Sequence, residues 1–303
     1  MTTRRTFIST AALGVVTAAV HSPLARAQAR TMQTRAIPST GERLPVIGMG
    51  TSGSFEVGPG DEREALREVL ARFLAGGGTL IDTAPTYSIA EDALGELLRD
   101  AGTRDRCFIA TKLSGVSGRE AGLAQFASTL SSLGTDRVEL LQVHNLGDWK
   151  TQLAVARELK TQGKVKYVGL THYVDRAHDA LAEAVAASKP DFLQINYSVT
   201  QRAAEKRVLP LARDLGVAVL ANRNFDDGAL FARVAGKAVP AWAVEAGITS
   251  WAQLFLKFAL SNPAVTVVIP ATGKPQRQTD NLRAGVGPTL DAKRRSALIA
   301  SVE

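Results

Sequence analysis

A regular alternation of short apolar segments with longer amphipathic segments is the feature of this sequence that most limits its fold. The apolar segments are mostly continuous runs, such as Val-Thr-Val-Val-Ile near the C-terminus, and such runs are typical of strands buried on both faces. We predict strands at residues 46–50, 79–82, 107–112, 138–144, 165–170, 192–196, 217–221 and 265–270. Between them, apolar residues recur at helical spacing, and we predict helices at residues 61–75, 90–100, 119–133, 149–162, 176–188, 203–215, 250–260 and 275–283, with a closing helix at 291–302.

Strands that alternate with helices in this way indicate an α/β fold, and we predict a (β/α)8 TIM barrel, which typically needs about 250 residues. An open doubly wound sheet is the alternative, but no Gly-x-Gly-x-x-Gly turn follows the first strand. Residues 32–37 and 43–47 flank a Pro/Ser/Gly turn and predict an N-terminal β-hairpin that closes the bottom of the barrel. After the seventh strand, residues 223–247 are predicted to form a long functional loop.

The N-terminus has the pattern of an export signal. A twin-arginine pair, Arg4 and Arg5, precedes a short apolar run and an Ala27-x-Ala29 cleavage pattern. The apolar run is too short to span a bilayer, although an uncleaved N-terminal anchor is the alternative. We therefore predict a signal peptide at residues 1–29, a single barrel domain at residues 30–303, and export of the folded protein to the periplasm.

Charge and composition exclude several classes of function. Removing residues 1–29 takes away three arginines and no acidic residue, so the net charge falls from +7 to +4. No run of basic residues is present, so we expect no nucleic-acid partner. The chain has four histidines and one cysteine, Cys107, without the spacing of a zinc site, so we predict no metal and a buried, inert thiol.

Polar residues end several of the predicted strands, and chemistry in such a barrel sits at the C-terminal ends of the strands. Asp82, Lys112 and His144 each end an apolar run, and Tyr87 follows the first of them. Taken singly, each has an ordinary structural explanation, such as a turn carboxylate or a satisfied core histidine. Further polar side chains end later strands: Thr171, His172, Gln194, Asn196, Asn222 and Arg223.

Together these residue types suit proton transfer to a carbonyl. A phenol is a weak acid near neutrality because its ordinary pKa is about 10. A nearby lysine would lower that pKa, and a carboxylate would keep the lysine charged and oriented. A histidine in the same pocket can stabilise a developing alkoxide. Since no side chain carries hydride, a nicotinamide cofactor is implied.

The chain resembles the aldo-keto reductase family from about residue 44 to about residue 281. The resemblance rests on Ile-Asp-Thr-Ala-x-x-Tyr ending at Tyr87, the run from Tyr87 through Glu91 to Gly95, Ala-Thr-Lys ending at Lys112, Leu-Gln-Val-His ending at His144, the turn Gly50-Thr51, and Gly163-Lys164-Val165. It implies an eightfold barrel with a catalytic tetrad of Asp82, Tyr87, Lys112 and His144. It further implies reduction of an aldehyde or ketone to an alcohol, with Tyr87 as proton donor.

The resemblance also implies where a cofactor binds, with several departures. The usual Ser-Asn that contacts the nicotinamide amide is Thr171-His172, and Asn222 replaces the tyrosine that stacks on the nicotinamide, so Phe225 is a candidate for the lost stacking. After the eighth strand, Asp280 takes the place of the family's usual glutamate. The family's usual lysine is Ala271 in this chain, and Lys274 lies near enough in the sequence to compensate. We expect NADPH, with NADH possible, held by Thr51, Thr171, His172, Gln194, Asn222, Arg223, Thr272, Lys274, Arg277, Asp280 and Asn281.

Substrate and partners are less constrained by the sequence. Phe55, Trp149 and Phe225 are candidates for an apolar pocket lining around a small carbonyl substrate. A non-catalytic, cofactor-binding subunit on the same fold is the alternative function, and the export signal leaves room for a periplasmic redox partner. A hydrolase has little support, because no Gly-x-Ser-x-Gly elbow is present. We expect no membrane span in the mature chain.

Overall fold

The computed structural model describes residues 31–303, so the predicted signal peptide at residues 1–29 lies outside the described residues. The described chain contains an eight-stranded sheet in which every paired neighbour is parallel. Its strands follow the order of the chain: β3 (Met49–Gly50), β4 (Leu80–Asp82), β5 (Phe108–Leu113), β6 (Val138–His144), β7 (Val165–Thr171), β8 (Phe192–Asn196), β9 (Ala218–Asn222) and β10 (Val265–Val268).

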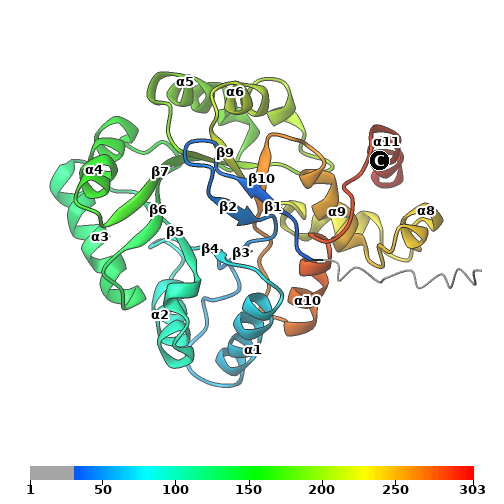
Figure 1. Cartoon of the computed structure of the whole chain (residues 1–303), viewed down its shortest axis with the longest axis horizontal. Coiled ribbons are helices and arrows are strands. Elements are labelled where there is room, and N and C mark those ends of the chain that lie inside the picture. Colours follow the sequence, from blue (N-terminus) through cyan, green and yellow to red (C-terminus); the bar gives the residue numbers. More distant parts are fainter. Residues whose placement is uncertain (1–30) are drawn as a thin grey trace, which may run out of the picture. The chain divides into compact units, whose positions relative to one another are not determined.

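The two edge strands of this sheet meet and nearly close it into a barrel. Bridges join Ile47 to Val268 and Gly50 to Ala271, and the amide of Gly50 donates to Pro270 O at 3.0 Å. A Cβ at Gly50 would lie 3.0 Å from Ile269 O, so glycine permits this close approach. The sequence prediction of a (β/α)8 barrel is confirmed (Figure 1).

Helices surround the barrel, as Figure 1 shows for α1 to α6. Their bounds are α1 (Asp61–Ala75), α2 (Ala90–Ala101), α3 (Arg119–Leu133), α4 (Trp149–Thr161), α5 (His178–Ser188), α6 (Val208–Asp214), α9 (Trp251–Leu260), α10 (Pro275–Arg283) and α11 (Ala292–Val302). The predicted helix at 203–215 is divided into a short 3-10 turn, η3 (Ala203–Glu205), and α6. A continuous helix would place Pro210 in its interior, where proline has no N–H to donate and clashes with the preceding turn. Three further 3-10 turns are η1 (Arg104–Arg106), η2 (Asp175–Ala177) and η4 (Asp226–Gly228).

The long segment predicted at residues 223–247 is partly helical rather than irregular throughout. It contains the short helices α7 (Ala229–Arg233) and α8 (Ala241–Glu245). Asp226 and Asp227 both have positive φ angles near +50°, a conformation that the sequence does not signal because neither is glycine. The segment is therefore ordered, and it follows directly from the end of β9.

Alternation along each strand separates the barrel interior from the helix layer. The buried interior cluster takes every second residue of the strands: Ile37, Leu44, Leu80, Phe108, Ala110, Leu140, Tyr167, Phe192, Ala218, Leu220, Val267 and Ile269. The next inward positions toward the C-terminal ends are polar, and they include Asp82, Lys112 and Gln194. The interior is thus apolar below and polar at its C-terminal mouth.

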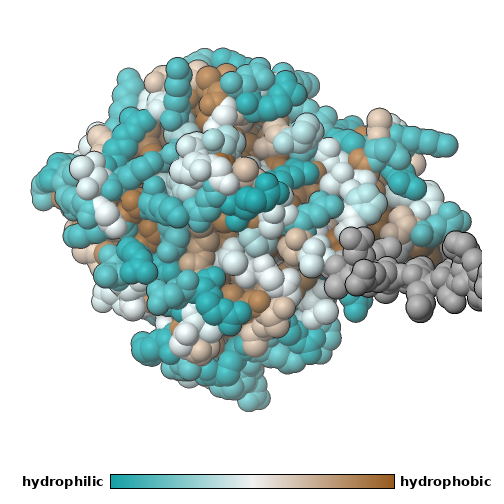
Figure 2. Space-filling model, in the orientation of Figure 1, coloured by the Kyte–Doolittle hydropathy of each residue, from teal (hydrophilic) through white to brown (hydrophobic). Residues whose placement is uncertain are grey.

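A two-stranded hairpin, β1 (Thr34–Ala36) with β2 (Arg43–Pro45), packs at the N-terminal end of the barrel. Ile37 and Leu44 belong to the interior cluster. The hydroxyl of Tyr167 donates to Glu42 at 2.5 Å and lies 2.8 Å from the hydroxyl of Thr40. These contacts anchor the hairpin across the opening opposite the polar mouth. Figure 2 shows this face, on which hydrophilic residues predominate.

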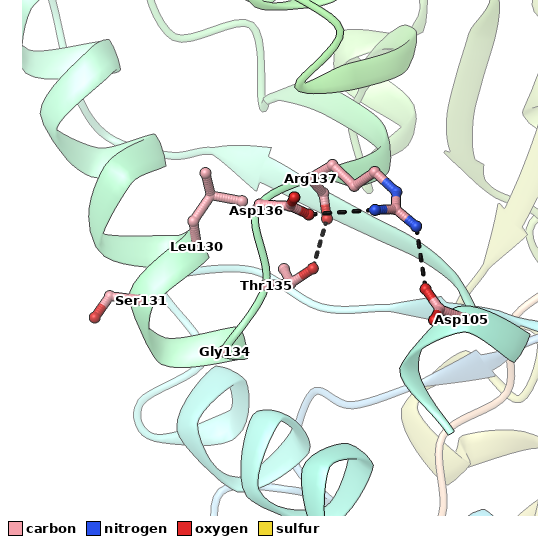
Figure 3. A pocket seen from close by; sticks show the side chains of 7 residues that line it. All are labelled: Asp105, Leu130, Ser131, Gly134, Thr135, Asp136 and Arg137. Atoms are coloured by element: carbon pink, nitrogen blue, oxygen red, sulfur yellow. Dashed lines mark hydrogen bonds and ion pairs between the residues drawn. The ribbon is translucent and has the colours of Figure 1, made fainter. Parts of the chain in front are cut away.

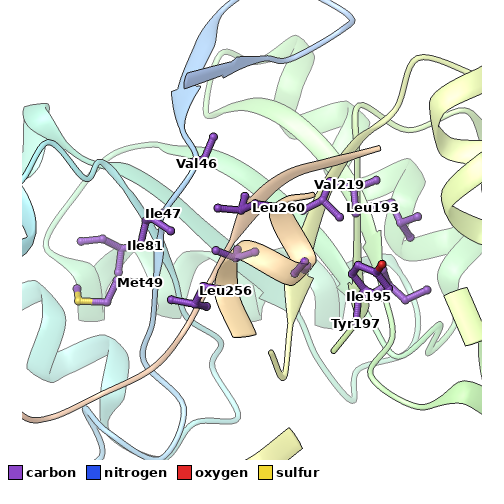
Figure 4. Close-up of a cluster of buried hydrophobic side chains, with 14 of the residues drawn as sticks. Val46, Ile47, Met49, Ile81, Leu193, Ile195, Tyr197, Val219, Leu256 and Leu260 are labelled. Atoms are coloured by element: carbon purple, nitrogen blue, oxygen red, sulfur yellow. The ribbon is translucent and has the colours of Figure 1, made fainter. Parts of the chain in front are cut away.

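The outer layer joins strands to helices through a second, larger cluster. In α1, Leu66, Val69, Leu70 and Phe73 recur at helical spacing and are buried. Each such fully buried side chain stabilises the fold by about 1.5–3 kcal/mol. Figure 4 draws part of this cluster, with side chains from β3, β4, β8, β9 and α9. Within residues 31–303, no helix combines the length and apolar character needed to cross a bilayer.

Candidate active site

A cavity of about 1140 Å³ opens at the C-terminal ends of the barrel strands. Among the residues chosen from the sequence, twelve line it: Asp82, Tyr87, His144, Thr171, Gln194, Asn222, Arg223, Phe225, Thr272, Arg277, Asp280 and Asn281. Strand alternation explains the convergence of those that end strands at inward positions, namely Asp82, His144, Thr171, Gln194 and Asn222, and the others reach the cavity from loops and from α10.

Asp82 and Lys112 form a buried ion pair, in which Asp82 lines the cavity and Lys112 lies beneath it. Lys112 Nζ donates to Asp82 Oδ2 at 2.9 Å and to Thr83 O at 2.7 Å. The lysine side chain is fully buried and the aspartate side chain is only 5% exposed, so solvent screens the pair very little. Burial alone would lower the pKa of Lys112, but the Asp82 carboxylate raises it above its ordinary value. The lysine is therefore held charged.

Tyr87 lies above this pair, on the loop between β4 and α2. Lys112 Nζ is 5.0 Å from the centroid of the Tyr87 ring. Burial raises the pKa of Tyr87 above its ordinary value, and this outweighs the opposing effect of the Lys112 ammonium. The sequence argument expected lysine to lower this pKa; lysine acts in that direction, but desolvation of the phenol is larger. Tyr87 is therefore a protonated phenol at neutral pH.

His144 ends β6 and meets Tyr87 edge to face, with ring centroids 6.2 Å apart and planes at 84°. Its Nδ1 lies 2.7 Å from the hydroxyl of Ser114. Burial and the nearby Lys112 charge lower the pKa of His144 to about 3, so the imidazole is neutral. If the Ser114 hydroxyl donates to Nδ1, the proton sits on Nε2 and His144 can donate a hydrogen bond from that atom.

Two residues that the sequence reasoning gave no role support this group. Ser114 continues the inward row of β5, and Gln125 of α3 clamps its backbone, accepting from Ser114 N at 2.8 Å and donating to Ser114 O at 2.9 Å. Gln142, fully buried in β6, donates to Asp82 Oδ1 at 3.4 Å. Gly169 makes room for it, since a Cβ there would lie 2.9 Å from Gln142 Cγ. The sequence feature that could have identified both residues is their position in the inward-facing, alternating rows of β5 and β6.

Amide groups fill the space between Asp82 and the later strands. Gln194 of β8 donates from Nε2 to Asp82 Oδ1 at 2.7 Å. Its Oε1 accepts from Thr171 Oγ1 and from Asn222 Nδ2, each at 3.2 Å. The structure thus brings together residues from β4, β7, β8 and β9 through one glutamine.

The far side of the cavity is formed by the loop after β10 and by α10. Thr272, Arg277 and Asn281 line it there, and the N-terminus of α10 begins beside them at Pro275. A helix N-terminus with an arginine favours a phosphate group. Asp280 also lines the cavity, but its carboxylate accepts from Ser250 and Gln253 at 2.6 Å each, so it is committed to the start of α9.

Aromatic side chains line the part of the cavity formed after β7 and β9. Four aromatic residues do so: Tyr173, Phe225, Phe231 and Trp251. Of these, only Phe225 was predicted from the sequence. The rings of Phe225 and Phe231 have centroids 5.1 Å apart. The Arg223 guanidinium lies 5.4 Å from the centroid of the Tyr173 ring and pairs with Asp227. Phe225 and Phe231 belong to the 223–247 segment, whose conformation periodicity does not reveal, and Tyr173 and Trp251 reach the cavity from the loop after β7 and from the start of α9.

Six predicted site residues do not line the cavity. Lys112 lies beneath it, as described. Phe55 is fully buried among the apolar residues of the helix layer, and Trp149 packs against the same layer at the start of α4, so neither forms a pocket wall. Thr51 is also buried, and its amide donates to Asp82 O at 3.0 Å. His172 accepts from Tyr173 N at its Nδ1, and Lys274 is the exposed residue preceding α10.

A second recess lies near the C-terminal end of α3, around the loop to β6 (Figure 3). It is shallow, and its polar groups are paired with one another: Arg137 contacts Asp105 at 3.1 Å and Asp136 at 3.3 Å. None of the tetrad residues lines it. Within residues 31–303, no cluster of three or more His, Cys, Asp or Glu side chains could hold a metal ion.

Comparisons with known proteins find aldo-keto reductases among the relatives of this chain. Aldo-keto reductase YhdN of Bacillus subtilis is 29% identical over 209 residues, covering 62% of this chain and 61% of that protein. The NADH-specific methylglyoxal reductase of Escherichia coli is 28% identical over 198 residues, covering 55% of this chain and 58% of that protein. The chain thus spans about three fifths of the length of these curated relatives.

Solved structures give the same fold. A thermostable aldo-keto reductase in complex with the inhibitor epalrestat is 26% identical, with a TM-score of 0.74 over 89% of this chain and 100% of that one. An aldo/keto reductase from Klebsiella pneumoniae in complex with NADP and acetate is 23% identical, with a TM-score of 0.73 over 86% of this chain and 93% of that one. The comparisons give no support to a non-catalytic subunit. Because the aldo/keto reductase family model matches residues 46–301, the chain belongs to the aldo/keto reductase family.

Proposed function

We propose that this protein is an NAD(P)H-dependent carbonyl reductase that converts an aldehyde or ketone to an alcohol, with Tyr87 as the proton donor. The observation that carries the proposal is the convergence of four side chains at the C-terminal mouth of the barrel, three of them lining the cavity and Lys112 beneath it. Lys112 is paired with Asp82 at 2.9 Å, its ammonium is 5.0 Å from the Tyr87 ring centroid, and the His144 ring meets Tyr87 edge on. The family match supports the reaction class.

The residues present fit a nicotinamide cofactor. The cavity carries polar groups at the barrel mouth and, by the loop after β10, an arginine beside a helix N-terminus, and both are features that suit a dinucleotide. Thr171 and Gln194 would face the nicotinamide, and Thr272, Arg277 and Asn281 would hold the phosphate end. When bound, the cofactor supplies the hydride. Arg277 favours NADPH over NADH because it can pair with an additional phosphate.

Side chains of the protein bind and protonate the carbonyl oxygen of the substrate. Neutral His144 donates a hydrogen bond to that oxygen from Nε2, which orients the substrate. Tyr87 gives its proton to the same oxygen as negative charge develops, and Lys112 stabilises the phenolate that remains. Asp82 keeps Lys112 charged and in place. Because the pKa of Tyr87 is raised, the acid form is retained through neutral pH, and reduction is expected to fail only as the pH rises through that pKa.

The test is turnover of a generic aromatic aldehyde by the purified mature protein, with NADPH and NADH compared in the same assay. Tyr87→Phe is expected to lower kcat by about 10²- to 10⁴-fold, the usual contribution of a positioned acid, while cofactor binding measured by fluorescence is retained. Tyr167→Phe is the matched control, because that hydroxyl bonds Glu42 at the opposite end of the barrel. Equal turnover in Tyr87→Phe and wild type would refute the assignment.

For location, we propose that the twin-arginine segment exports the folded, cofactor-loaded protein to the periplasm. The sequence pattern in residues 1–29 supports this proposal. Free nicotinamide cofactor is not expected in that compartment, so the reductase would retain its cofactor tightly or be re-reduced by a partner there. Fractionation should recover the mature chain in the periplasmic fraction with cofactor bound. Recovery of the full-length chain in the cytoplasmic fraction alone would contradict the proposal.

A further inference from the structure

Gln194 occupies the centre of a hydrogen-bonded relay that crosses the barrel mouth. The relay begins at Asn222 on β9 and Thr171 on β7, which both donate to Gln194 Oε1 at 3.2 Å. It continues from Gln194 Nε2 to Asp82 Oδ1 at 2.7 Å. It ends at Lys112, which donates to the other oxygen of the same carboxylate at 2.9 Å. Gln194 and Thr171 are both buried.

The orientation of the Gln194 amide is determined by its neighbours. A carboxylate accepts hydrogen bonds but cannot donate them, so the amide nitrogen has to face Asp82. This directs the amide oxygen toward Thr171 and Asn222, and donors are needed there. The amide nitrogen of Asn222 and the hydroxyl of Thr171 both fill that role. A side chain without a donor at 222 would remove half of this support.

We propose that Asn222 is a positioning residue, which acts through Gln194 to hold the Asp82–Lys112 pair against Tyr87. This inference rests on the proposed function, because Tyr87 is taken as the proton donor. It also gives a role to the asparagine that replaces the family's tyrosine here: Asn222 has no ring to stack on a nicotinamide, and its amide donates to Gln194 instead. Asp82 is thereby tethered from three later strands as well as from Lys112.

The expected consequence is a change in proton transfer. Asp82 Oδ1 has two amide donors, Gln194 at 2.7 Å and Gln142 at 3.4 Å, and the first is the better hydrogen bond. If Gln194 turns away, the Asp82 carboxylate loses its closer amide donor and its fixed position, and Lys112 is held less well under Tyr87. Lys112 is the group that opposes the raised pKa of Tyr87, so its displacement raises that pKa further. A weaker acid donates its proton more slowly, and the alkaline limb of the reduction profile moves to higher pH.

The experiment uses Asn222→Leu, which keeps the shape of the side chain and removes its donor. We expect kcat for aldehyde reduction to fall by about tenfold and the alkaline limb to rise by ~0.5–1 pH unit, a fraction of the shift that one close charge produces. KM for the cofactor should change less than kcat. Thr171→Val, which removes the other donor to Gln194, should shift the limb in the same direction. Adding Asn222→Leu to Gln194→Leu should cause little further loss, because both act through the same amide.

Two controls make the outcome decisive. Gln152→Leu removes a buried amide in α4 that donates to Gly118 O at 3.0 Å and to Asp148 at 3.4 Å rather than to a tetrad residue, and it reports any general cost of losing a buried amide. Titration of the Tyr87 phenol by ultraviolet absorbance, taken as the difference from Tyr87→Phe, gives the pKa without turnover. A wild-type pKa in Asn222→Leu, or a shift no larger than that in Gln152→Leu, would overturn the inference. An inactive wild type with a shifted phenol would instead refute the proposed function alone.

Discussion

The two faces of β5 end at two different buried carboxylates, and the difference between them separates the proposed chemistry from structural support. The inward row, Phe108, Ala110 and Lys112, leads into the barrel and brings Lys112 to Asp82. The outward neighbour, Thr111, faces the helix layer and donates to Glu91 Oε1 at 2.6 Å. Adjacent residues of one strand thus serve opposite sides of the sheet.

The partners of each carboxylate determine what it can do. Asp82 faces an ammonium and two amides, and it lines the cavity with Lys112 beneath it. Glu91, on α2, is held by two hydroxyls, from Thr111 and from Thr129 at 2.9 Å. Burial raises the pKa of Glu91 above its ordinary value, because hydroxyls compensate a buried charge less well than an ammonium. Glu91 therefore ties α2, β5 and α3 together, while Asp82 is the carboxylate that we propose orients the proton-transfer group.

Substitutions at Lys112 and Thr111 test most directly whether the two faces of β5 have separate roles. Lys112→Met removes the ammonium from beneath Tyr87 and leaves Asp82 without its charged partner. We expect kcat to fall by about 10²-fold or more and the free energy of unfolding to fall by ~3–5 kcal/mol, the cost of stranding one member of a buried pair. Steady-state kinetics and urea unfolding measure the two effects.

Thr111→Val is the matched change on the other face of the same strand. It keeps the β-branched shape and strands one oxygen of Glu91, which costs about 1–3 kcal/mol of stability. Its effect on kcat should be small, because Thr111 faces away from the cavity. Equal losses of kcat in the two variants would mean that the faces are not functionally separate.

Much of this arrangement could be predicted from the sequence, because apolar runs that end in a polar residue identify both the strand and its mouth. Asp82, Lys112, His144 and Gln194 were all found in that way. Ser114 and Gln142 were missed, although their inward parity was readable, because a serine after a strand and a glutamine within one have many structural uses. Their partners across the barrel are set by register, which a single sequence does not provide.

The walls of the cavity were predicted less well. Phe55 and Trp149 are aromatic residues near strand ends, but both pack into the helix layer. Phe231 reaches the cavity from the 223–247 segment, which turns through positive φ angles at non-glycine residues, while Tyr173 lines it from the loop after β7 and Trp251 from the start of α9. Loop conformation of this kind depends on tertiary contacts, such as the hydrogen bonds from Thr200 and Gln201 to Asp226, rather than on local sequence.

A smaller effect is expected at Glu91, and it appears in the pH dependence of stability. A carboxyl whose pKa is raised in the native state contributes stability below its unfolded pKa of about 4.5, and this contribution is lost as the pH rises through the native value. Glu91→Gln cannot titrate, and its amide can still accept from Thr111 and donate to Thr129. The variant should therefore gain stability relative to wild type as the pH rises from acid to neutral.

Urea unfolding of wild type and Glu91→Gln across that pH range measures the difference. The kcat of the variant should stay close to that of wild type, in contrast to any change at Lys112. A stability difference that is constant with pH would show that Glu91 keeps the same affinity for its proton in the folded and unfolded chain. A large loss of kcat would place Glu91 in the catalytic machinery and remove the distinction between the two faces.

The smallest effect is expected at Ser114, where the inward row of β5 reaches His144. Ser114→Ala removes the 2.7 Å contact to Nδ1, so the imidazole is free to place its proton on either nitrogen. Loss of one hydrogen bond of ~1 kcal/mol corresponds to a fall in kcat of about 2- to 10-fold. Because burial and Lys112 lower the pKa of His144 to about 3, neither wild type nor variant should show an acid limb near the ordinary histidine value.

Ser117→Ala is the control, since that exposed hydroxyl contacts Asp148 at 3.3 Å and not His144. Measured pH profiles decide the matter: a limb near neutrality in wild type would mean that His144 works as a charged group, and an unaltered kcat in Ser114→Ala would mean that the inward row ends functionally at Lys112.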